Sequence, residues 1–432
     1  MMKQSINLIT LGCSKNIVDS EIIAAQFEQL GYKVYHETED DTDIIIINTC
    51  GFILDAKEQS IETILFFLEK KQKESKLFVI GCLAERYKKE LEETLPEVDG
   101  FYGFSELSNF FDLFKIPPFN LLHPTHRLLS TPSHYAYLKI SEGCDRQCAF
   151  CAIPTIRGKH ISKPKELLIT EAKTLVEKGV KEIMLIAQDL TYYGIDLYKK
   201  RSLASLLQEL AQIKGLEWIR LHYAYPVNFP YEILDVINDY KNICRYIDIP
   251  FQHINDNILK TMRRGHTASD TYQLIETLRS KIPHIAIRTT LISGFPGETK
   301  KEHNELLKFI EEARFERLGV FSYSQEENTP AYSLGDPINK KEKKRRLDEL
   351  MLLQQEISYE LNREKINTTL KVIIDDENEN FYLGRTEFDS PEVDNGVLID
   401  KEEKLEIGNF YNARIIDANT FDLVGKIAKE YV

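Results

Sequence analysis

The first third of the chain alternates short apolar runs with longer amphipathic segments, the pattern of a sheet whose strands are connected by helices. The apolar runs INLITLG (6–12), DIIIIN (43–48) and KLFVIG (76–81) predict strands. The segments SEIIAAQFEQLGY (20–32) and DAKEQSIETILFFLEKKQK (55–73) have helical periodicity. We therefore expect an α/β three-layer domain, of the Rossmann or flavodoxin-like kind, over residues 1–118.

A second series of strand and helix patterns begins at Tyr135, after a Pro/His-rich stretch that predicts a linker over residues 119–133. Helical segments alternate here with six candidate strands: YAYLKI (135–140), EIMLIAQ (182–188), WIRLHYA (218–224), YIDIPF (246–251), AIRTTLI (286–292) and RLGVFSY (317–323). Six units are fewer than the eight that close a β/α barrel. The pattern predicts a partial (β/α)6 barrel over residues 134–362.

The last part of the chain changes character again. Residues 340–366 read as one helix, with apolar positions at Leu347, Leu350, Ile357 and Leu361. Short strand patterns separated by turns then fill residues 365–432, which predicts a small OB-like β-barrel.

The composition is that of a globular protein, with 43% hydrophobic and 28% charged residues. The longest apolar run, IIIINTCGFIL (44–54), is too short for a membrane span and is interrupted by polar residues. The first residues lack the basic and apolar regions of a signal peptide. We expect a cytoplasmic protein that does not enter a membrane.

Seven cysteines in a reducing compartment favour metal or redox chemistry over disulfides. Three of them, Cys144, Cys148 and Cys151, lie within ISEGCDRQCAFCAIP (140–154), directly after a predicted strand. A zinc site completed by a distant ligand is one interpretation, but structural zinc has fourfold ligation and usually C-x2-C pairs. An iron–sulfur cluster with three thiolates leaves one iron open for a substrate or cofactor.

A second set of cysteines occupies equivalent places in the N-terminal domain. Cys13, Cys50 and Cys82 each fall just past the carboxyl end of a predicted parallel strand, the edge at which open α/β sheets bind ligands. Any one of them fits a buried structural role, but three such positions predict a shared metal site. Cys244 has no partner nearby and is predicted to be structural.

The C-x3-C-x2-C motif, with Phe150 before its last cysteine, resembles that of the radical S-adenosylmethionine (SAM) superfamily. LISGFPGET (291–299) also resembles the superfamily's I-x-G-x-x-x-E element near the adenine, through Ile292, Gly294 and Glu298. The resemblance implies that SAM completes the cluster and that Phe150 and Gly294 lie at the SAM site. Phe150 is equally well explained as a core aromatic.

The whole domain order resembles the methylthiotransferases, in which a TRAM domain forms the C-terminal β-barrel. That resemblance implies two 4Fe–4S clusters, one on Cys13, Cys50 and Cys82 and one on Cys144, Cys148 and Cys151. It also implies that SAM serves both as methyl donor and as radical source, and that an electron donor and a sulfur donor are partners. No catalytic residue is expected beyond the cluster cysteines.

The acidic C-terminal region bears on the substrate. From Thr369 onward the chain has 7 Lys+Arg against 15 Asp+Glu, within a total net charge of −13. Such a region repels RNA and attracts a basic protein. The stretch GRTEFDSPEVDNGVLI (384–399) resembles the tail of the branch that modifies an aspartate of a small-subunit ribosomal protein, the RimO type, and its Asp389, Glu392 and Asp394 are candidates for an acidic docking face.

Two alternatives stay open. One is methylthiolation of an adenosine in tRNA, for which KKEKKRR (340–346) is the candidate basic stripe, although a solvated helix start explains that run better. The other is a non-catalytic iron–sulfur electron carrier or adaptor.

Overall fold

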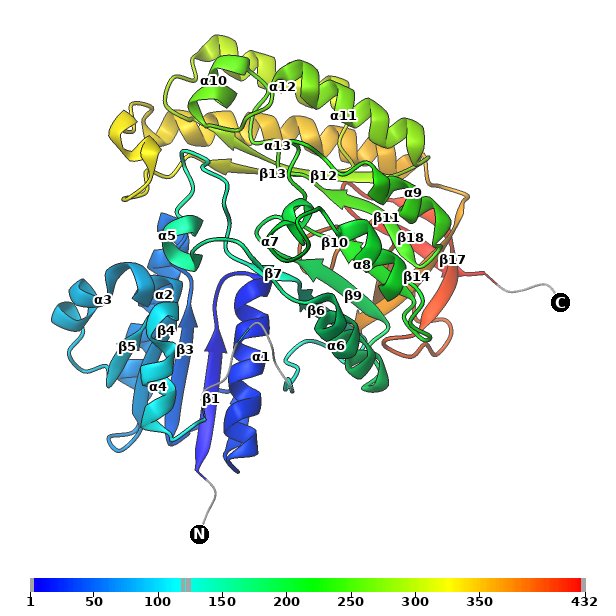
Figure 1. Ribbon diagram of the computed structural model, residues 1–432. Coiled ribbons are helices and arrows are strands. Elements are labelled where there is room, and N and C mark those ends of the chain that lie inside the picture. Colours follow the sequence, from blue (N-terminus) through cyan, green and yellow to red (C-terminus); the bar gives the residue numbers. More distant parts are fainter. Residues whose placement is uncertain (1–3, 118–120, 122–125, 429–432) are drawn as a thin grey trace.

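The computed structural model describes residues 4–117, 121 and 126–428, which form two α/β units and a small β-barrel (Figure 1). Much of the predicted linker 119–133 lies outside the described residues. Within the part that is described, Arg127 is buried and pairs with Glu21 and Glu171. The end of the linker is thus held between the two α/β units.

The N-terminal unit is a parallel sheet in the order β2-β1-β3-β4-β5. This is the flavodoxin-like order, in which the chain changes direction across the sheet between β1 and β3. Its strands are β1 (Ser5–Thr10), β2 (Lys33–His36), β3 (Ile44–Thr49), β4 (Lys76–Gly81) and β5 (Gly100–Tyr102), and its helices are α1 (Ser14–Gln29), α2 (Leu54–Lys70), α3 (Cys82–Thr94), η1 (Phe104–Glu106) and α4 (Leu107–Leu113).

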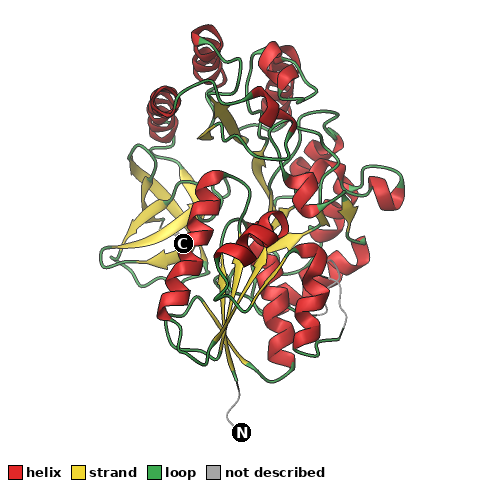
Figure 2. Ribbon diagram, turned by 90° about the vertical axis from the view of Figure 1, so that its left-hand side faces the viewer, coloured by secondary structure: helices red, strands yellow, loops and turns green. Residues whose placement is uncertain are grey.

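Helices cover both faces of this sheet (Figure 2). Side chains of a strand alternate between its two faces, and the isoleucine run of β3 follows that rule. Ile44 and Ile46 pack under α1 and α4, whereas Ile45 and Ile47 pack under α2 and α3. The apolar run therefore gives a strand buried on both sides, as predicted.

The central unit is a curved parallel sheet in the order β13-β12-β11-β10-β9-β6, with its long helices on the outside (Figure 1). No pairing joins β6 to β13 within the described residues, so the predicted partial barrel is confirmed. The strands are β6 (Tyr135–Lys139), β9 (Glu182–Ile186), β10 (Trp218–Leu221), β11 (Ile243–Asp248), β12 (Ala286–Ser293) and β13 (Arg317–Ser322).

The helices and small elements of the central unit surround this sheet. The longer helices are α6 (Lys165–Glu177), α8 (Leu203–Leu210), α9 (Glu232–Asp239), α11 (Ala268–Lys281), α12 (Lys300–Ala313) and α13 (Lys340–Arg363). The shorter elements are β7 (Ser141–Glu142), α5 (Ile153–Arg157), β8 (Ile161–Ser162), η2 (Leu190–Tyr192), α7 (Ile195–Tyr198), α10 (Asp256–Thr261) and η3 (Pro330–Leu334).

The predicted helix at residues 340–366 is α13, and its basic start differs from the sequence expectation. Lys343 and Arg346 are buried, where a solvated helix start was expected. The ammonium of Lys343 donates to the carbonyl of Tyr323 at 2.7 Å, and Arg346 pairs with Glu298 at 2.7 Å. Two of the six basic residues of the apparent stripe therefore serve packing against the central unit and are not available to nucleic acid.

The C-terminal region forms a closed barrel in the order β14-β15-β16-β18-β17, which confirms the predicted OB-like fold. Its strands are β14 (Thr369–Glu377), β15 (Phe381–Thr386), β16 (Val397–Asp400), β17 (Phe410–Ala418) and β18 (Leu423–Ile427). Cys244 is buried between this barrel and the central sheet, in an apolar cluster with Trp218 and Ile373, as a structural cysteine would be. No helix in the described ranges is long and apolar enough to cross a bilayer.

The acidic docking face predicted on residues 389–394 is wrong. Asp389 is buried and paired with Arg317, and the carboxylate of Asp394 accepts from Arg288 and from the Tyr246 hydroxyl. Glu392 accepts a hydrogen bond from the hydroxyl of Tyr135. These acids close the amino-terminal end of the partial barrel, because each finds a partner on a central strand.

Acid is expected to weaken this junction between the central sheet and the C-terminal barrel. Burial alone would raise the pKa of Glu182, but Arg385 and Arg220 outweigh it and hold that pKa below its ordinary value of 4.5. A carboxylate with a lowered pKa stabilises the fold above pH 4.5, and the stabilisation is lost as the pH falls toward its folded pKa. We expect the protein to unfold at a lower temperature once the pH is below 4.5, partly because this carboxylate becomes protonated.

The Glu182→Gln variant isolates this contribution. It should lose about 3–5 kcal/mol of unfolding free energy at neutral pH, because it leaves the buried Arg220 without a carboxylate and Arg385 with Asp375 alone. Its thermal midpoint should also depend less on pH between 7 and 3 than that of the wild type. Parallel pH curves for the two proteins would show that Glu182 does not carry the effect.

Candidate cluster sites

The first three-cysteine site lies at the carboxyl edge of the N-terminal sheet. Cys13 follows β1 at the start of α1, Cys50 follows β3, and Cys82 is the first residue of α3 after β4. The strand order sets β1 beside β3 and β3 beside β4, so the three positions are neighbours. Cys13 and Cys50 flank the β1/β3 switch point, where flavodoxin-like sheets bind their ligands.

Glycines allow these strand ends to approach one another. Gly12 has φ +94°, and a Cβ there would lie 2.7 Å from the Cβ of Cys50. Gly81 has φ +99°, and a Cβ there would lie 2.4 Å from Oδ1 of Asn48. Only glycine combines the left-handed backbone with the absence of a side chain. The turns before Cys13 and Cys82 therefore depend on these two residues.

The surroundings of the first site suit a cation bound by thiolates. Burial raises the pKa of the Cys82 thiol to about 12, and the nearby Arg157 guanidinium opposes that rise. Thiolates at Cys13 and Cys50 are close enough to raise the pKa of Cys82 further. Three mutually repelling thiolates are stable together only when a metal centre balances their charge. The donor set fits an iron–sulfur cluster.

The second site lies on the loop after β7, at the carboxyl end of β6, and holds Cys144, Cys148 and Cys151. Burial raises the pKa of Cys144 to about 11 and that of Cys151 to about 12, and the charge of Cys148 contributes to both. A guanidinium nitrogen of Arg264 donates to Sγ of Cys148 at 3.2 Å. The site has the same chemistry as the first: three thiols and one arginine.

No group of three His, Cys, Asp or Glu side chains in the described ranges converges closely enough to hold a single metal ion. The thiols of a cubane cluster bind different iron atoms, so they need not converge on one point. The arrangement differs in this respect from a zinc site, whose ligands share one ion.

Helix α5 connects the two sites (Figure 1). It begins directly after the second triad. Ala152, which precedes the helix, and Ile156 within it pack against Cys82 of the first triad. At its end, Arg157 donates to Oδ1 of Asn16 at 2.6 Å and lies 3.8 Å from Sγ of Cys82. Cys82 of the first triad therefore packs along the segment that directly follows Cys151 of the second.

The N-terminal unit is fastened to both edges of the partial barrel. At the β6 edge, Asp19 is fully buried and pairs with Lys139 and Arg157. At the β13 edge, the carboxylate of Glu326 accepts from Lys57 and from Arg86, each at 2.9 Å. The N-terminal unit thus spans the gap between β6 and β13 and is held to both edges by buried ion pairs.

The predicted SAM-binding residues lie at the carboxyl ends of β12 and β6. Gly294 has φ +76°, and a Cβ there would lie 2.6 Å from Cγ of Lys343. Its amide donates to the carboxylate of Glu298 at 2.8 Å, which holds the turn in shape. Phe150 is half-buried against an apolar cluster that includes Phe295 and Tyr323. The core interpretation of Phe150 therefore fits its surroundings as well as a ligand contact does.

Several buried polar atoms at the mouth of the partial barrel have no hydrogen-bond partner among the described residues. They belong to residues at or beyond the carboxyl ends of the strands: Gln188 Oε1, Gln252 Oε1, Ser293 Oγ and Arg146 Nη2. Buried polar groups are nearly always satisfied, and this end of a β/α barrel is where ligands bind. A polar ligand such as SAM fits these donors and acceptors.

Arg157 and Arg264 did not emerge from the sequence. Each is close to its cysteine in space, but Arg264 lies 116 residues away from Cys148 and Arg157 lies 75 residues from Cys82. Neither belongs to the cysteine motif. An alignment of related chains is the signal that would find them.

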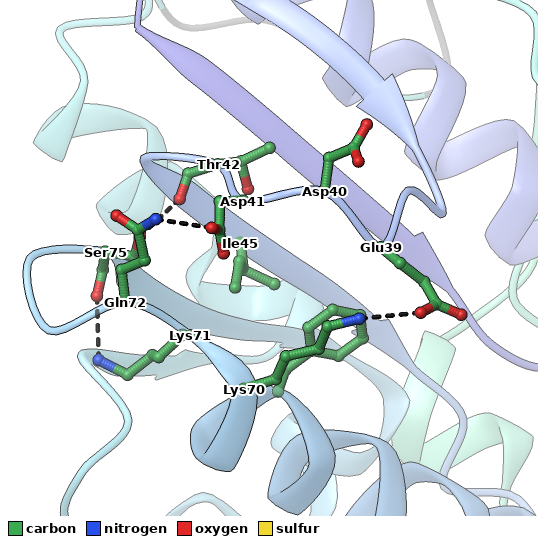
Figure 3. A pocket seen from close by; sticks show the side chains of 10 residues that line it. Glu39, Asp40, Asp41, Thr42, Ile45, Lys70, Lys71, Gln72 and Ser75 are labelled. Atoms are coloured by element: carbon green, nitrogen blue, oxygen red, sulfur yellow. Dashed lines mark hydrogen bonds and ion pairs between the residues drawn. The ribbon is translucent and has the colours of Figure 1, made fainter.

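A recess at the opposite edge of the N-terminal sheet is a separate feature (Figure 3). It lies where β3 and β4 begin, and is crossed by the Lys70–Glu39 ion pair and by a hydrogen bond from Gln72 to Asp41. Its volume of about 10 Å³ holds about one water. It has no room for a substrate.

Three family models match the chain in succession. Residues 5–103 match the uncharacterized protein family UPF0004, residues 138–310 match the radical SAM superfamily, and residues 366–428 match the TRAM domain.

Curated relatives match the chain along its whole length. The ribosomal protein uS12 methylthiotransferase RimO of Christiangramia forsetii is 51% identical over 429 residues, which cover 99% of this chain and 95% of the relative. The protein of the same description from Bacteroides thetaiotaomicron is 52% identical over 437 residues, and the match covers 100% of both chains.

Solved structures share the fold at low sequence identity. The radical SAM methyltransferase TsrM from Kitasatospora setae, with cobalamin and a [4Fe-4S] cluster bound, has a TM-score of 0.54 at 14% identity, over 76% of this chain and 77% of that one. The cobalamin-dependent SAM radical enzyme OxsB has a TM-score of 0.50 at 16% identity, over 80% of this chain and 56% of that one.

Proposed function

Because the chain belongs to the RimO family of ribosomal protein uS12 methylthiotransferases, we propose that it places a methylthio group on the β-carbon of an aspartate in uS12. It is a radical SAM methylthiotransferase, and uS12 is its substrate. In our proposal Cys144, Cys148 and Cys151 hold the 4Fe–4S cluster at which SAM binds. The three cysteines of the N-terminal unit hold a second cluster, where the sulfur is delivered.

The connection of the two triads through α5 is the observation that carries this proposal. Sulfur insertion needs one site that activates a C–H bond and another that presents sulfur to the same carbon. Cys82 packs against Ala152 and Ile156, which directly follow Cys151, and this closeness supports a single reaction space for the two triads. An electron carrier has no need of two incomplete triads joined in this way.

The side chains of the protein position and shield this chemistry. When bound, the two clusters and SAM supply the one-electron and sulfur-transfer reactivity that side chains lack. Arg264 donates to Sγ of Cys148, and the Arg157 guanidinium beside Cys82 opposes the rise that burial causes in the pKa of that thiol. The N-terminal unit covers the gap between β6 and β13, and ion pairs at both edges hold its three cysteines in place against the central unit.

The charge of the C-terminal region supports a basic protein as substrate in place of tRNA. Asp389 and Asp394 are used internally, but other acids of the barrel are exposed, among them Asp376, Glu377 and Glu402. Exposed acids attract a basic ribosomal protein and repel a phosphate backbone. An electron donor and a sulfur donor complete the set of partners that the reaction needs.

The proposal is tested by giving the enzyme both substrates. Clusters are reconstituted anaerobically, and the enzyme is incubated with SAM, sulfide and a reductant, in parallel with uS12 and with tRNA. We expect uS12 to gain the mass of one methylthio group in place of hydrogen, at an aspartate identified by fragmentation. A gain on tRNA alone would overturn the proposed substrate. An absence of 5′-deoxyadenosine in every mixture would favour the non-catalytic alternative.

A further inference from the structure

Lys15 carries a buried charge between Cys13 of the N-terminal unit and the strand ends of the central sheet. It lies two residues after Cys13, in the first turn of α1, and is 7% exposed. The side chain leaves its own domain: its ammonium lies 3.2 Å from the ring centroid of Tyr223, which follows β10 of the central sheet. It therefore points from the first cluster site toward the mouth of the partial barrel.

The ammonium of Lys15 has no carboxylate partner among the residues that the structure describes. The other buried cations at this domain junction each have one: Lys139 and Arg157 share Asp19, and Arg127 has Glu21. A buried charge without a counter-charge is unfavourable, and a contact with an aromatic face compensates only part of that cost. Lys15 can therefore bind an anion for which the described residues offer no carboxylate.

The polar neighbours of Lys15 do not neutralise its charge. Burial lowers the pKa of His222 well below its ordinary value, and the charge of Lys15 contributes, so this imidazole is neutral at neutral pH and is no counter-ion. Tyr223 has an unusual φ of +66°, and its amide donates to the carboxylate of Asp248 at 3.2 Å. That carboxylate is itself paired with Arg288 at 3.2 Å.

We propose that Lys15 binds the side-chain carboxylate of the aspartate that is modified. This inference rests on the proposed function, in which the reacting β-carbon lies between the two triads. The carboxylate is bonded to that carbon, so an ammonium held between the triads is placed to orient it through a charge-assisted hydrogen bond. An adenine ring carries no such anion, and Lys15 would thereby distinguish an aspartate from a base.

SAM offers a second carboxylate, on its methionine part, and the test separates the two sources. The affinity of the enzyme for uS12 and for uS12 with the target aspartate changed to asparagine is measured by fluorescence anisotropy, for wild type, Lys15→Met and Lys15→Arg. The affinity for SAM is measured in the same three proteins. Iron content and cluster absorbance report whether each variant assembles both clusters.

We expect Lys15→Met to weaken binding of uS12 roughly 30-fold or more, the usual effect of removing one partner of a desolvated charge pair. Lys15→Arg should restore most of the affinity. Against the asparagine form of uS12, Lys15→Met should cause no further loss, because the carboxylate is already absent. Lys33→Met is the matched control: Lys33 belongs to the same domain and lies over the Tyr35 ring, but it is exposed.

Three outcomes would overturn the inference. Equal weakening of both forms of uS12 would assign Lys15 a structural role. Weaker binding of SAM in Lys15→Met would assign the ammonium to the methionine carboxylate. An unchanged affinity of Lys15→Met for uS12 would show that Lys15 does not contact the bound aspartate. If the wild-type enzyme methylthiolates no aspartate of uS12, the proposed function itself fails, and that result is distinct from the other three.

Discussion

Alanine at Cys148 is expected to abolish both 5′-deoxyadenosine formation and methylthiolation, whereas alanine at Cys82 is expected to abolish methylthiolation alone. Each site offers three thiols, so the loss of one leaves a cluster without the ligation that holds it. The loss should exceed the roughly 100-fold typical of residues that only support metal ligands. The measurement is chromatography of the nucleoside products together with mass spectrometry of uS12.

The Cys244→Ala variant is the matched control for this experiment. Cys244 is buried, as Cys82 and Cys148 are, but it lies in an apolar cluster between the central sheet and the C-terminal barrel. It should retain both activities and its full iron content. If Cys82→Ala loses 5′-deoxyadenosine formation while the cluster on Cys144, Cys148 and Cys151 is still assembled, the two sites do not act separately.

Removal of the Asp19 carboxylate is expected to destabilise the protein strongly. Asp19 is fully buried and is shared by Lys139 and by Arg157, whose guanidinium nitrogen is 2.6 Å away. The Asp19→Ala variant leaves two buried cations short of a partner, and breaking one buried pair typically costs about 3–5 kcal/mol. The cost should appear as a lower urea midpoint and as faster proteolysis near the junction of the two α/β units.

Glu28 provides the comparison on the same helix. It is exposed and pairs with His126 at 3.4 Å, so Glu28→Ala should change the unfolding free energy by no more than about 0.5 kcal/mol. Equal midpoints for the Asp19 and Glu28 variants would contradict the importance of the buried junction. Because Arg157 also contacts Cys82, we expect Asp19→Ala to disturb the N-terminal cluster before it unfolds the protein.

The periodicity of the chain was enough to predict how its strands and helices are arranged. The isoleucine run of β3 could only be a strand buried on both faces, and the apolar run before Cys82 likewise became a central strand. The position of each cysteine at a strand end followed, because parallel strands all end at the same edge. Local patterns of this kind act over a few residues, and a single sequence displays them directly.

Whether each acidic or basic side chain is exposed or buried was harder to predict. Asp389 and Asp394 were predicted to face solvent, but Arg317 and Arg288, from distant strands, draw them inside. Lys343 and Arg346 were placed on a solvated helix start, yet both are buried. Whether a charge is exposed depends on a partner far away in the sequence, and no local pattern reports that partner.

The sequence by itself determined the fold class, the two incomplete cysteine triads and the kind of chemistry they support. Only the tertiary structure decided how the triads are related, through the packing of Cys82 against Ala152 and Ile156, and which charges accompany them. Arg157 and Lys15 are revealed by contacts across domains, and Arg264 by a contact within the central unit between residues far apart in the sequence. The physical reason is that hydrophobic periodicity is set locally, whereas the energy of a buried charge is set by whatever the folded chain brings next to it.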